Sequence, residues 1–346
     1  MYFSSDNAGP ALPTVMARVT AANEGFTLPY GADPIMEEVR AEIRRVFEAP
    51  EAAVYLVATG TAANALALAC YAQPWQTVFC SQIAHIQEDE CNAPEFYSSG
   101  AKLCLVDTPD KMTADGLRAR VEAEGVRGVH GPERGPVSIT QVTERGSLYS
   151  IQELRDLCTV SKSFDLPVHL DGARFANALV ALGCTPAEMT WKAGVDVVCF
   201  GGTKNGCLGV EAVVFFDPAK AWEFELRRKR GAHLFSKHRF LSAQMAGYLQ
   251  DGAWLDAAKR SNENAAYLVA GLRAVGADFL HEPQANMVFV RFARGIHQRL
   301  HAAGAMYNMW EPGLESGDPD EKLAARLVCD WSITTDQIDL FLSHFE

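Results

Sequence analysis

Short apolar runs of strand length alternate along the first two thirds of the chain with segments that carry helical signals. The runs are AVYLVA from Ala53, TVFCS from Thr77, KLCLVD from Lys102, GPVSITQV from Gly135, LPVHLD up to Asp171, VDVVCF up to Phe200 and GVEAVVFF up to Phe216. Asp33 and Pro34 form an N-cap and first-turn pair ahead of a helical repeat of apolar residues, and Ser150 with Glu153 forms a capping box. Strands separated by helices predict a mainly parallel sheet that is covered by helices on both faces.

The last third of the chain has a different pattern. It is mostly helical from Pro218 to Ala274, and then two strand-like runs follow, NMVFVRF from Asn286 and RLVCDW from Arg326. A short helix between these runs and a final helix after Ser332 complete the pattern. We therefore expect an α/β protein with a large domain over residues 1–250 and a smaller C-terminal α+β domain over residues 251–346.

Composition narrows the class of partner and the cellular compartment. The chain has 346 residues, of which 48% are hydrophobic and 21% charged, so it can bury a large core. A formal net charge of −12 gives no electrostatic reason to expect nucleic acid or an anionic membrane as partner, and small metabolites fit better. The nine cysteines are dispersed without a CxxC pair, which favours reduced thiols and no metal site. With no secretory leader and no apolar run of about 20 residues, a cytoplasmic protein is expected.

A lysine stands at the end of one predicted strand, in a place where sheets of this kind bind ligands. Lys204 lies in the turn CFGGTKNG, directly after the run VDVVCF. A lysine in a turn is usually solvated, and this residue alone leaves that interpretation open. However, a lysine held close to the backbone by small neighbours can lose its proton and attack a carbonyl, forming a Schiff base. Such a lysine suits an aldehyde cofactor.

Two further segments fit a cofactor of that class. Asp171, in HLDGAR, ends the predicted strand that precedes the strand of Lys204. Its carboxylate could pair with the pyridine nitrogen of pyridoxal 5′-phosphate (PLP). It could also simply cap a helix, with Arg174 on the surface after it. Gly60 and Thr61 begin an Ala-rich helix, whose first N–H groups could bind a phosphate, although a tight turn without a ligand explains them equally well. The lysine and the Ser or Thr of a nucleotide P-loop are missing, which disfavours ATP.

Three more segments have both a structural and a functional interpretation. His85 in AHIQEDE could stack on a pyridine ring or serve the core, and Glu88, Asp89 and Glu90 after it are typical of a solvated face. Arg326, at the start of RLVCDW, could hold the carboxylate of an amino acid, although arginine is common at strand starts. The basic segment 227–239 favours a subunit interface or a phosphate contact across it.

The motifs SSDN, LPYGADP, ATGTAAN, AHIQEDE, HLDGARFANAL, FGGTKNG and RLVCDW occur in this order. As an ordered set they resemble low-specificity L-threonine aldolases, in the β-eliminating-lyase-like group of fold type I PLP-dependent enzymes, from about residue 3 to the end. The resemblance implies a PLP-dependent transferase-like large domain and a homotetramer built as a dimer of dimers. It also implies PLP-dependent cleavage of L-threonine, L-allo-threonine and other β-hydroxy-α-amino acids to glycine and an aldehyde.

The resemblance also implies roles for single residues around the cofactor. It assigns covalent attachment of PLP to Lys204, pairing with the pyridine nitrogen to Asp171, phosphate binding to Gly60 and Thr61, and stacking on the ring to His85.

Other implied roles concern the substrate. Ser5, Arg174 and Arg326 would hold the substrate carboxylate or cofactor oxygens, and Tyr30 would lie near a site completed by a second subunit. His85, directly or through water, is our first candidate for the base that removes the β-hydroxyl proton, and Glu88 is the second.

One departure from the family pattern leaves the proton chemistry open. Many relatives carry a second histidine where this chain has ITQVTERGSLYS, which contains Thr143 and Glu144 but no histidine. A PLP-dependent β-eliminating lyase or an aminotransferase acting on a small amino acid, and a non-catalytic PLP-binding protein, are the alternatives. A nucleotide-binding α/β protein is disfavoured by the missing P-loop signature.

Overall fold

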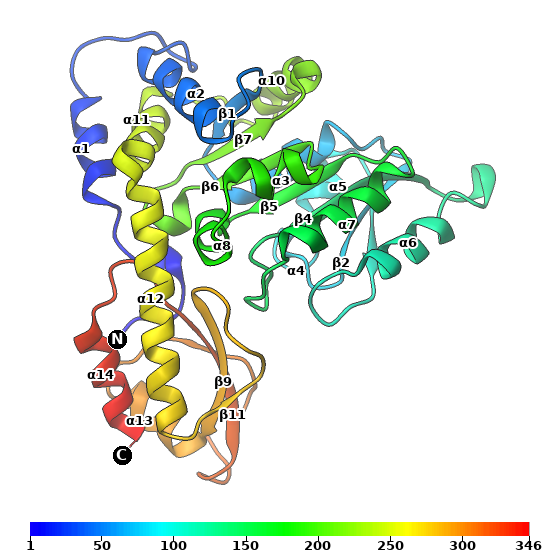
Figure 1. Cartoon of the computed structure of the whole chain (residues 1–346). Coiled ribbons are helices and arrows are strands. Elements are labelled where there is room, and N and C mark those ends of the chain that lie inside the picture. Colours follow the sequence, from blue (N-terminus) through cyan, green and yellow to red (C-terminus); the bar gives the residue numbers. More distant parts are fainter. Residues whose placement is uncertain (346) are drawn as a thin grey trace.

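The computed structural model describes residues 1–345, and its larger part is built on a seven-stranded sheet (Figure 1). In the order β1-β7-β6-β5-β4-β2-β3 the strands are Ala53–Val57, Glu211–Phe215, Val197–Gly201, Val168–Gly172, Glu133–Thr140, Gln76–Ser81 and Lys102–Val106. Strand β7 pairs antiparallel with β1 and β6, whereas β2–β3, β2–β4, β4–β5 and β5–β6 are parallel pairs. The prediction of a mainly parallel sheet is confirmed.

Within residues 1–345, fourteen α-helices connect and cover the strands, and some of them begin at a capping side chain. They are Pro13–Ala21 (α1), Pro34–Val46 (α2), Gly60–Ala69 (α3), His85–Glu88 (α4), Ala93–Tyr97 (α5), Ala114–Ala123 (α6), Ile151–Lys162 (α7), Phe175–Leu182 (α8), Pro186–Met189 (α9), Ala221–Arg230 (α10), Arg239–Leu249 (α11), Ala253–Ala274 (α12), Arg294–Ala302 (α13) and Thr335–Leu342 (α14). Asp33 caps α2 by accepting a hydrogen bond from the Met36 N–H at 3.0 Å. Ser150 and Glu153 form the predicted capping box of α7.

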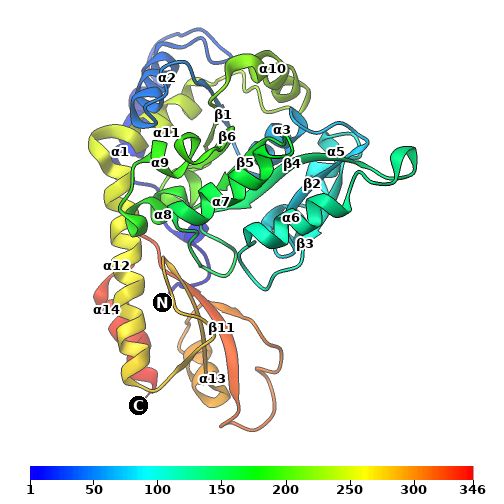
Figure 2. The same ribbon diagram turned by 45° about the vertical axis from the view of Figure 1, so that its right-hand side comes forward.

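Helices cover both faces of the large sheet, as expected for strands that are buried on two sides (Figure 2). In β1, Val54 and Leu56 pack into a core that includes apolar residues of α2, α7, α8 and α11. Tyr55 and Val57, which point the other way, pack with α3 and with Phe224 of α10. The sheet is therefore a rigid layer whose strand ends can hold side chains in fixed positions.

A smaller lobe follows α12 and contains a four-stranded sheet of order β10-β11-β9-β8. Its strands are Asn308–Met309, Lys322–Val328, Met287–Ala293 and Asp278–Phe279, and α13 and α14 contribute Leu300 and Phe341 to its core. The predicted strand RLVCDW was placed too late, because β11 begins at Lys322 and ends at Val328. Arg326 therefore lies within the strand and does not open it.

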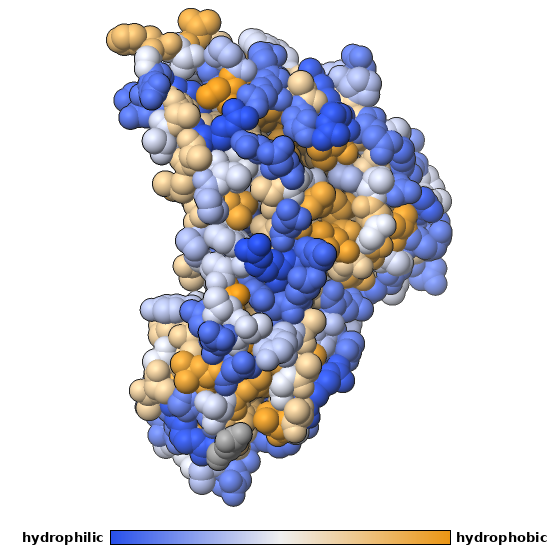
Figure 3. All heavy atoms as spheres, turned by 60° about the vertical axis from the view of Figure 1, so that its left-hand side comes forward, coloured by the Kyte–Doolittle hydropathy of each residue, from blue (hydrophilic) through white to orange (hydrophobic). Residues whose placement is uncertain are grey.

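The long helix α12 joins the two parts, and the molecule narrows between them (Figure 3). Ala257 and Ala258 of this helix pack in the core of the large sheet, whereas Ala265 and Leu268 pack in the core of the small lobe. Helix α12 thus contributes side chains to both cores. The predicted domain boundary at residue 250 stays a prediction.

The first residues of the chain run back across both parts. Phe3 is fully buried in the core of the small lobe, and its carbonyl accepts a hydrogen bond from the Val328 N–H at 2.8 Å. Nine residues later, the Leu12 N–H donates to the Gly206 carbonyl at 2.8 Å, next to the Lys204 turn. Within residues 1–345 no helix is both long and apolar enough to cross a membrane.

Candidate active site

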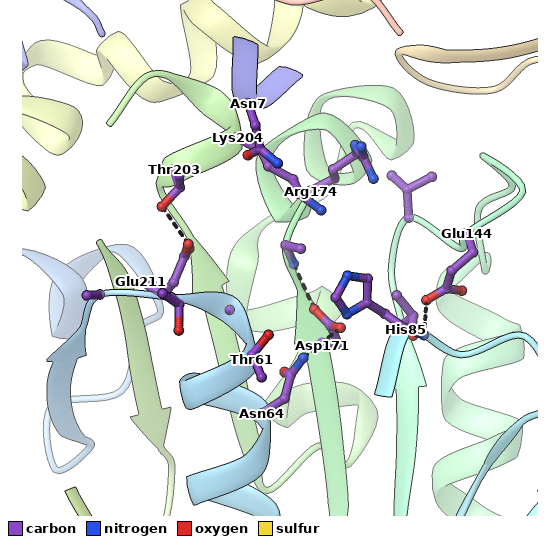
Figure 4. Close-up of a pocket in the computed structure, with 16 residues that line it drawn as sticks. Asn7, Thr61, Asn64, His85, Glu144, Asp171, Arg174, Thr203, Lys204 and Glu211 are labelled. Atoms are coloured by element: carbon purple, nitrogen blue, oxygen red, sulfur yellow. Dashed lines mark hydrogen bonds between the residues drawn. The ribbon is translucent and has the colours of Figure 1, made fainter. Parts of the chain in front are cut away.

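A cavity of about 300 Å³ opens where β4, β5 and β6 end, beside the first turn of α3 (Figure 4). Side chains from several separate segments point into it. They are Asn7, Thr61, Asn64, His85, Glu144, Asp171, Arg174, Thr203, Lys204 and Glu211, with the backbone of Gly60 beside them. Strand ends and a helix start thus converge as expected for ligand sites in this type of sheet.

Lys204 lies in a single 3₁₀ turn, Thr203–Asn205, directly after β6. A Cβ atom at Gly201 would lie 2.5 Å from the Ala173 carbonyl oxygen, and one at Gly202 would lie 2.7 Å from the Val210 carbonyl oxygen. Both positions therefore need glycine for the close approach of neighbouring backbone. The guanidinium of Arg174, and then burial, lower the pKa of the Lys204 amine. A larger share of the amine is consequently unprotonated and nucleophilic.

Asp171 is buried near the end of β5, and hydrogen bonds fix both of its carboxylate oxygens. Oδ1 accepts from the Ala173 N–H at 3.0 Å, and Oδ2 accepts from the Asn64 amide at 2.9 Å. Asn64 lies one helical turn after Gly60, on the cavity side of α3. A carboxylate held in this way suits a partner that carries a positive charge, such as a protonated ring nitrogen.

His85 is the first residue of α4, and its ring lies beside Asp171 (Figure 4). Its Nδ1 atom is 2.8 Å from Glu90 Oε1, and this hydrogen bond raises the pKa of His85 although burial opposes it. The interpretation of residues 88–90 as a solvated face holds for Glu88 and Asp89, which are exposed, but is wrong for Glu90, which is buried. Glu88 does not line the cavity, so it is not a second candidate for the base.

The start of α3 provides a place for an anion. Thr59 caps the helix by accepting from the Ala62 N–H at 3.2 Å, and Gly60 and Thr61 line the cavity. An added Cβ at Gly60 would meet no atom within 4 Å, so the space beside this turn is open. The N–H groups of a first helical turn have no partner within the helix, and they bind phosphate in many proteins. A buried amine, a fixed carboxylate and a helix start around one cavity together fit PLP.

Arg174 lines the cavity, and its guanidinium already has a partner. Its Nε and Nη2 atoms lie 2.6 and 3.0 Å from the two carboxylate oxygens of Asp6, and both side chains are largely buried. Burial alone would raise the pKa of Asp6, but Arg174 and Lys204 hold it below its ordinary value. Asn286 donates a further hydrogen bond to Asp6 at 3.2 Å, so this carboxylate links the residue just before β9 of the small lobe to Arg174 at the cavity.

Three residues that the resemblance placed at the site do not line the cavity. Ser5 is occupied as an N-cap, accepting from the Asn7 N–H at 3.1 Å. Arg326 donates to the Ser4 carbonyl at 3.3 Å and leaves its Nε atom without a partner among residues 1–345; burial and then Arg174 lower its pKa. Tyr30 is half exposed on the loop between α1 and α2, with its N–H 3.2 Å from the Ser236 carbonyl oxygen.

The sequence interpretation gave no role to two carboxyl groups that line the cavity, Glu144 and Glu211. Glu144 Oε1 accepts from the His85 N–H at 2.7 Å and so caps α4 from another segment, while burial and then Asp171 raise the pKa of Glu144 to about 7. Glu211 accepts from the Gly202 N–H at 2.8 Å and from the Thr203 hydroxyl at 2.6 Å, and burial raises its pKa to about 7. Glu144 thus lines the cavity, and it belongs to the segment ITQVTERGSLYS, which has no histidine.

Thr143, its neighbour, bonds within its own turn, where its hydroxyl accepts from the Ser147 N–H at 3.0 Å. Asp6 belonged to the quoted motif SSDN, and Asn64 is four residues after Gly60, so the motif and the helical spacing could have pointed to both. Glu90 and Glu211 offered no such local signal, because only the folded chain shows that they are buried. Glu144 stood in the quoted segment ITQVTERGSLYS, where many relatives carry a histidine.

Comparison with known proteins gives consistent matches over nearly the whole chain. A family model described as β-eliminating lyase matches residues 3–294. A low specificity L-threonine aldolase of Pseudomonas sp. (strain NCIMB 10558) is 40% identical over 95% of this chain and 92% of its own length. The protein of that name from Pseudomonas aeruginosa is 38% identical over 97% of this chain and 94% of its own length.

Solved structures also match over nearly the whole of this chain. The threonine aldolase of Leishmania major superposes with a TM-score of 0.92 at 25% identity, covering 99% of this chain and 98% of that one. A structure of SPT with PLP has a TM-score of 0.71 at 19% identity, covering 100% of this chain and 86% of that one, and shows the shared fold alone.

Proposed function

We propose that this chain, which belongs to the β-eliminating lyase family, is a PLP-dependent aldolase. It would cleave L-threonine, L-allo-threonine and other β-hydroxy-α-amino acids to glycine and an aldehyde. The observation that carries the proposal is the convergence of Lys204, Asp171 and the start of α3 on one cavity. Relatives that are 38–40% identical over nearly the whole chain are named for this reaction.

The chain's residues would hold the cofactor at three points. The Lys204 amine would attach it covalently, Asp171 would pair with its ring nitrogen, and the N–H groups of Gly60 and Thr61 would bind its phosphate. His85 would lie against the ring. When bound, PLP accepts the electrons of the bond that breaks at the α-carbon of the substrate.

Arginine would orient the substrate. A guanidinium can hold a carboxylate through two parallel hydrogen bonds, and Arg174 presents such a group at the cavity. In this structure Asp6 occupies that group, so the substrate carboxylate must share Arg174 with Asp6 or displace it. Arg326 and Ser5, which lie outside the cavity wall, would reach the substrate only after a movement of the first residues of the chain.

The β-hydroxyl proton must leave before the bond between the α- and β-carbons breaks. The Nδ1 atom of His85 is engaged by Glu90, which leaves Nε2 as the other ring nitrogen. The latter atom would accept the proton, directly or through water. After cleavage, a proton returned to the α-carbon completes glycine.

The direct experiment is to mix the purified, PLP-loaded protein with L-threonine, L-allo-threonine and 3-phenylserine and to measure the aldehyde released. Acetaldehyde from threonine and benzaldehyde from 3-phenylserine, with glycine in equal amount, support the proposal. No aldehyde from any of the three would overturn it. Pyruvate and ammonia from serine would instead identify a β-eliminating lyase acting on a small amino acid.

We further infer assembly into a homotetramer, and a cytoplasmic location stays a prediction. The loop between α1 and α2 exposes Phe26, Leu28 and Tyr30, and apolar side chains project at the top of the view in Figure 3. This loop packs on the basic segment 227–239, because Arg239 donates to the Gly25 carbonyl at 3.0 Å and Lys229 lies 5.3 Å from the centre of the Tyr30 ring. Several large apolar side chains on one exposed loop are typical of a protein interface.

A further inference from the structure

Four polar side chains, three of which line the cavity, form a continuous chain of hydrogen bonds. His85 Nδ1 lies 2.8 Å from Glu90 Oε1, and the Asn64 amide donates to that same oxygen at 2.9 Å. The same Asn64 nitrogen also donates to Asp171 Oδ2 at 2.9 Å. The chain therefore connects the candidate base to the carboxylate that is expected to hold the cofactor ring.

Glu90 is an unusual member of this chain. Its side chain is completely buried, and its Oε2 atom has no hydrogen-bond partner among residues 1–345. Burying a carboxylate is costly unless it is paired, and its partners here are the His85 ring and the Asn64 amide. Glu90 follows α4, the helix that carries His85, so its carboxylate returns to the ring from five residues further along the chain.

The charges around His85 come from four elements. Glu90, beyond α4, and Asp171, on β5, both raise the pKa of His85, whereas Lys204, in the turn after β6, lowers it. Glu144, in the loop after β4, bonds to the His85 backbone. Glu90 is the only one of these groups that is hydrogen-bonded to the ring within residues 1–345, so it alone distinguishes Nδ1 from Nε2.

We propose that Glu90 is a positioning residue that keeps the proton of neutral His85 on Nδ1, so that Nε2 faces the cavity as a proton acceptor, and that Asn64 ties this pair to Asp171. The inference rests on the proposed function for the identity of the proton that Nε2 accepts. A histidine with the opposite tautomer would present an N–H to the cavity and could not act as a base there. A carboxylate hydrogen-bonded to the far nitrogen is how histidine bases and ligands are commonly oriented.

The first test is a measurement on wild-type protein that needs no turnover. Nitrogen NMR of protein labelled at histidine, with the His85 signals assigned by their loss in His85→Asn, reports the tautomer and the pKa. We expect a proton on Nδ1 in the neutral ring and a pKa above 6.5. A neutral His85 with its proton on Nε2 would overturn the proposal, even if Glu90 variants failed to fold.

Two substitutions then separate charge from contact. Glu90→Gln removes the charge but keeps the shape, so the pKa of His85 should fall and the acid limb of the kcat/KM profile should move to lower pH by the same amount. Glu90→Ala removes the contact, so the preference for Nδ1 should be lost and kcat should fall about 10- to 100-fold, with KM for threonine changing much less. Glu88→Gln, two residues before Glu90 but exposed, is the matched control and should change neither readout.

The outcomes distinguish this inference from the proposed function. If the wild type releases no aldehyde, the proposed function fails, while the NMR titration still decides whether Glu90 sets the state of His85. If the wild type is active but His85 keeps its tautomer and pKa in both folded Glu90 variants, Glu90 only fills space and the inference is wrong. Loss of kcat in these variants without any change at His85 would also overturn it.

Discussion

At the scale of single residues, the amine of Lys204 is the group whose removal should have the largest effect. We expect Lys204→Ala to lose the visible absorbance of covalently held PLP and to lower kcat/KM for threonine by about 10³-fold or more, because no other lysine among residues 1–345 lines the cavity. Absorbance spectra and aldehyde release measure the two effects.

A second lysine controls for the loss of a positive charge. Lys192 does not line the cavity, is exposed and pairs with Glu48 at 2.6 Å, so Lys192→Ala should keep both the absorbance and the rate. A Lys204→Ala protein with wild-type spectrum and turnover would show that another group anchors the cofactor.

Glu211 makes the stability of the protein depend on pH. Burial raises its pKa from 4.5 to about 7, so the folded protein binds a proton that the unfolded chain has already released. The favourable contribution of that proton is complete below pH 4.5 and is lost as the pH rises to 7. We expect the free energy of unfolding of Glu211→Gln, relative to wild type, to increase by about 3 kcal/mol between these pH values and to stay level above them.

Urea unfolding at pH 5, 6, 7 and 8 measures this difference. Glu88→Gln replaces an exposed carboxylate and should show no such trend. A constant difference between wild type and Glu211→Gln at all four pH values would mean that Glu211 stays ionised in the fold.

At the scale of elements, the contact between α1 and α11 depends on one glycine. An added Cβ at Gly247 of α11 would lie 2.6 Å from the Thr14 carbonyl oxygen and 2.7 Å from the Val15 Cα atom, and both of these belong to the backbone of α1. Alanine favours a helix by about 1 kcal/mol over glycine, but overpacking against backbone costs about 1 to 3 kcal/mol. We expect Gly247→Ala to lower the free energy of unfolding by up to about 2 kcal/mol, measured by urea denaturation.

Gly271 of α12 is the matched comparison, since its added Cβ would meet only the flexible end of the Leu342 side chain. That side chain can move, so Gly271→Ala should cost less than Gly247→Ala or even stabilise the protein. If the two substitutions cost the same, the backbone contact of α1 with α11 would not be the cause.

The hydrophobic pattern predicted these elements far better than it predicted the site. A strand buried on both faces must be apolar throughout, so runs such as AVYLVA and VDVVCF coincide with β1 and β6. The position of Glu90 could not be predicted in this way, because a carboxylate after a helix is usually solvated and only the packing of α3 on α4 buries it. The resemblance to a family placed Lys204 and Asp171 at one site, but it carried no information on the Asp6 partner of Arg174.

At the scale of the whole molecule, the exposed loop between α1 and α2 is the surface that should join copies of the chain. Phe26 is fully exposed and Leu28 is 65% exposed, so replacing both with serine removes apolar area without touching the core. We expect Phe26→Ser with Leu28→Ser to lower the mass of the assembly, from a tetramer to a dimer or a monomer, in sedimentation velocity.

Phe96→Ser, on α5, removes an aromatic ring of similar exposure and should leave the mass unchanged. If the double variant is still a tetramer, the interface lies on another surface. A wild type that sediments as a monomer would contradict the proposed assembly itself.

Residues 3–12 run back across both lobes, and this path affects when the site is completed during synthesis. A ribosome makes Phe3 and Asp6 long before it makes their partners Asn286, Met306 and Val328. Contacts between such distant parts of a chain form late, and the early segment stays unpaired until then. A nascent chain can therefore complete the large sheet long before the Asp6–Arg174 pair is held in place. A chain whose translation stops before Asn286 should form the cavity without that fixed pair.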